Sequence, residues 1–433
     1  MAESTEAACL LQSGAIYSRR LGMKTSTGEA IFLGVKPGAV SLYFGDAPIF
    51  HFDLEGRWQR AYLDGTHYLK GLDGSVRSID RDREPSGLTL RRETLAYAET
   101  TDVDALVRST ALALLDDLDS GHATLLDPPA NVRAFEAGEA REFLESVGHW
   151  DASAWFSHRE RYLATYGRLP FLPPETPNAL VLQATLGDRE GRAFGGAKGD
   201  EHYVRDGREF LDHARAVARL LGGRVAQHRG IFLAGPDALR RPIGDVLDWL
   251  ATIRKVFPTP GETPIGAAWD DQPADPGPVV AFLDDFSAPR LDPGDWQALR
   301  EAGLARVTLG VESGDPAVRS GFGKSWEEGE LRSTVRGLKA AGMGLGLVAL
   351  VGAAGRTGSA RHVGATGDLF GSLGLGRGDL VTLVDVRGLE EKPADDRPGL
   401  SDEETAEELS TLKAALASIG AKVVSYNPAK RRS

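Results

Sequence analysis

The chain has 433 residues, of which 42% are hydrophobic and 26% charged, and its formal net charge is −12. This length suits two or three domains, and the composition is that of an ordinary globular protein. The acidic excess argues against a general nucleic-acid surface, and no apolar run approaches the roughly 18 residues of a membrane-spanning helix, so we expect neither nucleic-acid nor membrane partners.

The first segment, residues 1–27, is predicted to be an N-terminal tail. Its opening stretch carries acidic residues rather than the basic start of a secretory signal peptide, so we expect a cytoplasmic protein. It also holds Cys9, the single cysteine of the chain. One thiol cannot form an intrachain disulfide, a four-cysteine zinc site or a cysteine-ligated iron–sulfur cluster, so a structural metal is not expected.

Residues 28–100 alternate apolar and polar side chains between turns, which predicts an antiparallel β leader domain. The Asp-Gly pairs at 64–65 and 73–74 favour hairpin turns. Residues 101–170 have a helical apolar period and end near prolines, which predicts a helical connector.

From residue 171 to 400 the pattern becomes regular. Apolar strands at 178–187, 230–235, 278–285, 305–314, 345–352 and 379–388 alternate with amphipathic helices. Such alternation predicts a parallel sheet covered by helices, and six units fit either a doubly wound sheet or an open (β/α) barrel. Residues 401–433 are predicted to form a C-terminal helix and a terminal strand.

Charged and glycine residues collect after the predicted strands, where ligand sites lie in both architectures. Glu312 and Ser313 can accept hydrogen bonds from a ribose or an ammonium group, or Ser313 can simply cap the next helix. Asp284 and Asp285 form a carboxylate pair, but adjacent strand residues point to opposite faces. The glycine-rich stretch from 352 to 358 precedes a helix but lacks a dinucleotide fingerprint.

The order of strand-end motifs resembles the radical S-adenosylmethionine (SAM) superfamily, in a branch with a β-rich leader domain. The similar pieces are FLPPETPNALVLQATLG, IFLAGPDAL, LVGAAG and GAKVVSYN. The resemblance implies an α/β fold with a partial (β/α)6 TIM-type barrel, a 4Fe-4S cluster on three cysteines after the first strand, and SAM on the fourth iron.

Carried over by position, the resemblance also implies a set of SAM contacts in this chain. Gly235 and Asp237 match the motif at the SAM amino group, and Glu312 and Ser313 match residues near its ribose and carboxylate. Leu350 and Gly352 match the segment beside its adenine.

The chain departs from the resemblance in the first loop, where the three cysteine positions hold Asp188, Arg192 and Gly195. Arginine and glycine supply no side-chain ligand to iron, so no 4Fe-4S cluster and no radical chemistry are expected, while SAM binding stays possible.

Three functions stay open, and with them whether the protein is an enzyme. The first is a cluster-less protein, a pseudoenzyme that binds SAM, another nucleotide or a partner protein at the barrel mouth. The second is an enzyme with acid/base chemistry at the strand ends, with Asp188, Glu190 and Asp285 as catalytic candidates. The third is an interaction module that works through the leader domain.

Overall fold

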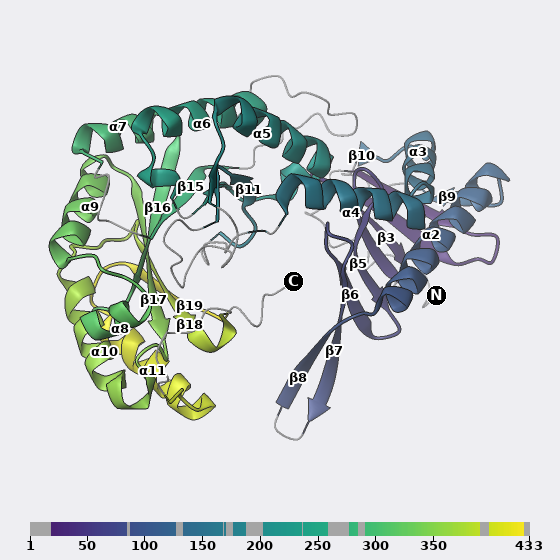
Figure 1. Ribbon diagram of the computed structural model, residues 1–433. Coiled ribbons are helices and arrows are strands. Elements are labelled where there is room, and N and C mark those ends of the chain that lie inside the picture. Colours follow the sequence, from purple (N-terminus) through teal and green to yellow (C-terminus); the bar gives the residue numbers. More distant parts are fainter. Residues whose placement is uncertain are drawn as a thin grey trace.

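The computed structural model describes residues 19–84, 87–126, 133–167, 169, 176–187, 202–235, 237–258, 277–284, 291–389 and 398–427. In these residues the chain forms an antiparallel β domain covered by helices and a parallel α/β domain (Figure 1).

The leader sheet is a meander in which consecutive strands pair in antiparallel fashion from β1 to β8. Asp64 and Gly65 both have positive φ, of 48° and 87°, and close the β5–β6 hairpin as the Asp-Gly pair predicts. The strands are β1 (Arg19–Lys24), β2 (Ala30–Lys36), β3 (Ala39–Phe44), β4 (Ile49–Asp53), β5 (Trp58–Leu63), β6 (Thr66–Lys70), β7 (Val76–Glu84), β8 (Gly87–Thr94), β9 (Thr124–Leu126) and β10 (Arg133–Ala134).

Two expectations about segments need correction. β1 lies in the segment predicted as the 1–27 tail, yet it is a buried strand that pairs with β2 over its whole length. β9 and β10 lie in the segment predicted as a helical connector, and both pair with β1. The sheet therefore begins earlier than the turn signals suggest and takes two short strands from the connector.

Three helices cover the leader sheet: α2 (Tyr97–Asp119), α3 (Ala137–Gly148) and α4 (Ala152–Tyr166). Their apolar residues join the core of the sheet, as the edge-to-face contact of Phe52 with Phe143 illustrates, with ring centroids 5.6 Å apart. The leader and its helices thus share one hydrophobic core.

The second sheet has seven strands, all parallel, in the order of the chain: β11 (Leu180–Gln183), β14 (Ile231–Ala234), β15 (Val279–Leu283), β16 (Leu304–Glu312), β17 (Gly344–Val351), β18 (Leu380–Asp385) and β19 (Lys422–Tyr426). A doubly wound sheet reverses its strand order part-way, so this unbroken order selects the open barrel. The terminal strand adds a seventh member to the six that the pattern predicted. A small hairpin of β12 (Thr185–Leu186) and β13 (Tyr203–Val204) follows β11.

The helices of this domain lie along the outer side of the curved sheet (Figure 1). They are α5 (Gly207–Leu221), α6 (Ile243–Val256), α7 (Pro293–Glu301), α8 (Pro316–Gly321), α9 (Glu328–Ala340), α10 (Gly355–Gly371) and α11 (Asp402–Ala415), with 3₁₀ turns η1 (Gly222–Gln227), η2 (Ala238–Arg240) and η3 (Val386–Gly388). None of the described helices is both long and apolar enough to cross a bilayer.

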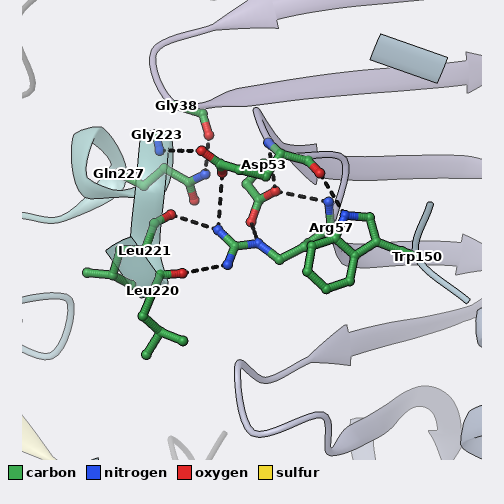
Figure 2. Close-up of polar contacts among 9 residues, drawn as sticks. Gly38, Asp53, Arg57, Trp150, Leu220, Leu221, Gly223 and Gln227 are labelled. Atoms are coloured by element: carbon green, nitrogen blue, oxygen red, sulfur yellow. Dashed lines mark hydrogen bonds and ion pairs between the residues drawn. The ribbon is translucent and has the colours of Figure 1, made fainter. Parts of the chain in front are cut away.

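The two domains are joined by a buried polar junction (Figure 2). Arg57, in the turn after β4, donates hydrogen bonds to the carbonyls of Leu220 (2.5 Å) and Leu221 (2.7 Å) at the C-terminal end of α5. Its Nε pairs with the buried Asp53 at 2.6 Å. A cation at a helix C-terminus also complements the helix dipole, so this contact fixes the leader on the barrel.

Candidate functional site

Charged side chains gather at one edge of the barrel because all seven strands are parallel. Asp284 follows β15, Glu312 ends β16, Gly352 follows β17 and Asp385 ends β18. Since the strands pair in chain order, these positions follow one another along the C-terminal edge of the sheet. This edge is where the sequence predicts a ligand site.

The centre of the edge is a buried cluster of Asp284, Glu312 and Lys324, whose side chains are at most 2% exposed. Lys324 lies in the loop between α8 and α9. Its ammonium group contacts the Asp284 carboxylate and lies 3.3 Å from Oε1 of Glu312. It also donates to the backbone carbonyl of Asp284 at 3.1 Å. One cation therefore holds two carboxyl groups from neighbouring strands together.

The backbone at the end of β16 is shaped to present Glu312. The register with β17 shifts between Gly310 and Glu312, and Glu312 itself has φ of 59°, in the left-handed region that non-glycine residues rarely adopt. A side chain at Gly310 would overlap the Asp284 carboxylate and meet Glu312 Oε1 at 2.9 Å. The bulge and the glycine are therefore what allow both acids to reach one lysine.

Burial raises the pKa of Glu312 to about 8, with the Asp284 charge adding to the rise and Lys324 opposing it. Burial lowers the pKa of Lys324, but the charges of Asp284 and Glu312 outweigh this and raise it. Near neutral pH Glu312 therefore holds a proton more readily than an ordinary glutamate does, although the ammonium group of Lys324 lies 3.3 Å away. A carboxylic acid kept neutral near pH 7 is a property of many functional sites.

Two carboxyl oxygens of the cluster have unused hydrogen-bonding capacity. Oδ2 of Asp284 and Oε2 of Glu312 are buried and make no hydrogen bond with any residue that the structure describes. Buried carboxyl oxygens normally have a partner, because leaving one unpaired costs roughly 1–3 kcal/mol. These two atoms are the features of the edge that most directly indicate a missing ligand.

Ser313, expected near the ribose and carboxylate of SAM, faces away from the Glu312 cluster. Its hydroxyl donates to Nδ1 of His362 (2.7 Å) and accepts the backbone N–H of Asp315 (2.9 Å). His362 in turn donates from Nε2 to the carbonyl of Leu350 (2.9 Å), and all three side chains are buried. Burial lowers the pKa of His362, in keeping with this neutral tautomer. Ser313 is thus used to fix the loop against α10.

The residues expected beside adenine lie next to this network. Leu350 is buried and offers its carbonyl to His362. The N–H of Gly352, where φ is 84°, donates to Glu408 of α11 at 2.6 Å. Their backbone groups are thus already engaged within the fold.

Asp237, expected at the SAM amino group, is buried near the end of β14. Its carboxylate pairs with Arg240 at 3.3 Å, and its Oδ2 lies 3.3 Å from Nε2 of His202. Gly235, two positions earlier, has φ of 128°, and a side chain there would overlap Thr185. Glycine is therefore required for the close approach of the second strand end to the first.

Five of the predicted positions lie outside the described residues: Asp188, Glu190, Arg192, Gly195 and Asp285. The three cluster positions are among them. These three positions supply one carboxylate, one guanidinium group and a glycine without a side chain. Such a set does not fit a cluster that needs three thiolates. Among the described residues, no group of three or more His, Cys, Asp or Glu is arranged to hold a metal ion.

Lys324 was not foreseen from the sequence. A lysine between Gly323 and Ser325 in a polar loop has the pattern of a solvent-exposed residue. His362 was missed for a similar reason, because a single histidine within a helix carries no spacing signal. Both are found only through the contacts of their side chains.

Comparison with known proteins gives distant structural neighbours. No protein-family model matches the chain, and no curated protein sequence matches it significantly. Coproporphyrinogen III oxidase (HemN) from Escherichia coli is similar at 13% identity over 60% of this chain and 56% of its own, with a TM-score of 0.39. The methyltransferase TsrM from Kitasatospora setae is similar at 18% identity over 47% and 36%, with a TM-score of 0.34. The cobalamin-dependent enzyme OxsB is similar at 16% identity over 56% and 31%, with a TM-score of 0.34.

All three are radical SAM enzymes. This chain spans little more than half the length of HemN and about a third of the other two. At these identities and TM-scores the likeness carries no argument about this chain, and function has to be argued from the strand-end cluster.

Proposed function

We propose that the protein is a radical-SAM-like barrel that binds a small ligand without radical chemistry. The ligand is SAM or another molecule with an ammonium group, bound at the ends of β15 and β16. The observation that carries this proposal is the pair of buried, unpartnered oxygens, Oδ2 of Asp284 and Oε2 of Glu312. Both are acceptors when their groups are ionised, and an ammonium group supplies three donors.

The two unpartnered carboxyl oxygens of the cluster favour a cationic, hydrogen-bond-donating group of the ligand. With Glu312 protonated, the cluster is neutral; an arriving ammonium group would favour the ionised form of Glu312. Binding near pH 7 should therefore release a proton, because the pKa of Glu312 is about 8 in the free protein. Calorimetry in two buffers of different ionisation enthalpy measures this proton directly.

The decisive binding experiment is a SAM titration of the full chain and of the Glu312→Gln variant. We expect binding by the natural chain and a loss of at least about tenfold in the variant, since an amide cannot ionise. Asp379→Asn is the matched control, because Asp379 is also a buried acid paired with a lysine, Lys339 at 2.6 Å, but lies before β18 at the opposite end of the barrel. Equal affinity in all three proteins would refute the site.

The absence of a 4Fe-4S cluster is a separate part of the proposal and has its own test. Anaerobic reconstitution with iron and sulfide should leave the protein without bound sulfide, since Asp188, Arg192 and Gly195 provide no thiolate. Stoichiometric iron and sulfide in the purified chain would refute it.

A second candidate function is acid/base catalysis, favoured by one observation. A Glu with a pKa of about 8 next to a buried lysine matches the requirement for a proton donor that works near neutral pH. Mass spectrometry of SAM after long incubation with the protein separates the two functions. Intact SAM supports a binding protein. More than one mole of a cleavage or transfer product per mole of protein supports an enzyme.

A further inference from the structure

A large cavity lies at the junction of the two domains, between the turn after β4, helix α4 and helix α5. It has a volume of about 830 Å³ and its lining includes no residue of the Asp284 cluster. A volume of this size, at a domain boundary, is within the usual range of small-molecule sites, roughly 300–1,000 Å³. Glu55 and Arg57, in the turn after β4, line it, and Figure 2 shows the contacts that Arg57 makes with the end of α5.

Four arginines line this cavity, and two of them are used by the fold. Arg57 is bound to the carbonyls at the end of α5, and Nε of Arg205 donates to the carbonyl of Gln183 at 2.9 Å. Arg161 of α4 and Arg219 of α5 form no ion pair or hydrogen bond through their guanidinium groups with the residues that the structure describes. Two guanidinium groups are thus open to a ligand.

The lining of the cavity includes three acids, and none of them forms a described ion pair with Arg161 or Arg219. Glu55 pairs with Arg57 at 3.1 Å and accepts the N–H of Gly223 at 2.7 Å. Glu209 accepts the N–H of Asp206 at 2.9 Å in the capping box of α5. Asp212 is the third lining acid. In a chain of net charge −12, the four arginines of the lining exceed its three acids, which gives the cavity a formal excess of one positive charge.

A buried histidine in the wall gives an independent indication of a ligand. His158 is 2% exposed, and its Nε2 makes no hydrogen bond with any described residue. Burial, followed by the charges of Arg57 and Arg161, lowers the pKa of His158 to about 3, so its ring is neutral and lies in a positive field. A buried ring nitrogen without a partner normally indicates an absent hydrogen-bonding group.

From these contacts we infer that the junction cavity binds a small phosphate ester, with Arg161 and Arg219 holding the phosphate and Nε2 of His158 completing its hydrogen bonds. Arginine binds phosphate oxygens through two parallel N–H groups, which suits a dianion with three terminal oxygens. The cavity is larger than a bare phosphate, so the remaining volume accommodates the rest of the ester.

Titration of the full chain with inorganic phosphate, by calorimetry at low ionic strength, tests the inference. We expect saturable binding that weakens at least about tenfold in Arg161→Gln and in Arg219→Gln, the loss typical of a charge-assisted pair. The matched control is Arg215→Gln, one turn earlier on α5 and also exposed but absent from the lining, which should bind within twofold of the natural chain. His158→Asn reports on the third contact and should weaken binding less than either arginine variant.

Several results would overturn the inference. One is the absence of phosphate binding up to about tenfold above 1 mM, roughly the weakest useful affinity. The others are a loss of phosphate affinity in Arg215→Gln equal to that in the two arginine variants, and tighter binding of malonate than of phosphate. Because Arg161 and Arg219 are exposed, their variants should fold, and an unchanged melting temperature checks this. SAM affinity measured on the same variants keeps this test apart from that of the strand-end site.

Discussion

Replacing Lys324 by methionine tests the central claim about the strand-end cluster. The lysine side chain is 1% exposed and holds Asp284 and Glu312, themselves at most 2% exposed. Methionine keeps most of the volume, so the loss is electrostatic rather than steric. Removing one partner of a buried ion pair costs about 3–5 kcal/mol because the other charge stays buried without compensation.

The pH dependence of that loss identifies its cause. In the natural chain the pKa of Glu312 is raised from 4.5 to about 8, so its contribution to stability is complete below pH 4.5 and is lost as the pH rises through 8. Without Lys324, both carboxyl groups lose the cation that favours their charged forms. The deficit of Lys324→Met should therefore grow from pH 5 to pH 9.

Urea unfolding followed by circular dichroism at these pH values measures the deficit. Lys339→Met is the control, because Lys339 pairs with Asp379 at 2.6 Å but is one-third exposed. Asp379 is buried but keeps the N–H of Gly376 at 2.8 Å, and the exposed part of Lys339 is solvated, so this variant should lose less free energy of unfolding than Lys324→Met. A Lys324→Met loss no larger than that of Lys339→Met, or one independent of pH, would refute the reasoning.

Three further predictions concern other parts of the fold. The melting temperature of the natural chain should fall between pH 6 and pH 9, and Glu312→Gln should reduce this fall because the amide cannot ionise. An unchanged fall in the variant would mean that a group other than Glu312 causes it. Gly314→Ala should destabilise the protein by about 1–3 kcal/mol, since its methyl group would overlap the backbone of α10, whereas Gly364→Ala, with nothing within 4 Å, should be neutral or stabilising in thermal melts. Arg57→Met should cost roughly 3–5 kcal/mol in urea unfolding by leaving Asp53 buried and unpaired, and a loss below 1 kcal/mol would contradict the junction.

The sequence predicted the barrel well because its strands are buried on both faces and therefore apolar throughout. β17, for example, has seven buried residues among its eight, so its apolar run stands out from the amphipathic helices on either side. The leader boundary was less predictable. β1 (Arg19–Lys24) contains three cationic residues and has no turn signal before it, yet its arginines are buried.

The candidate site was predictable only in part. Glu312 was identified because it follows an apolar strand, and position along a strand can be read from sequence. Asp285 was the preferred catalytic candidate of the carboxylate pair, but Asp284 is the residue that binds Lys324. Asp285 lies outside the described residues, and the lysine that binds Asp284 comes from a loop 40 positions further along the chain. No local pattern encodes such a contact.

Helix α5 links the leader domain to the loop where the resemblance places the lost cluster. At its C-terminal end its carbonyls bind Arg57 of the leader. Nearer its start, Nε2 of His213 accepts the N–H of Gln183, and Arg205, just before the helix, donates to the carbonyl of the same residue. Gln183 ends β11, four residues before Gly187, after which the Asp188 loop begins. His213 and Arg205 also line the junction cavity. A ligand in that cavity would therefore contact His213 and Arg205, the two residues that bind the end of β11. Helix α5 and the residue before it thus connect the leader domain, the cavity and the end of the first barrel strand.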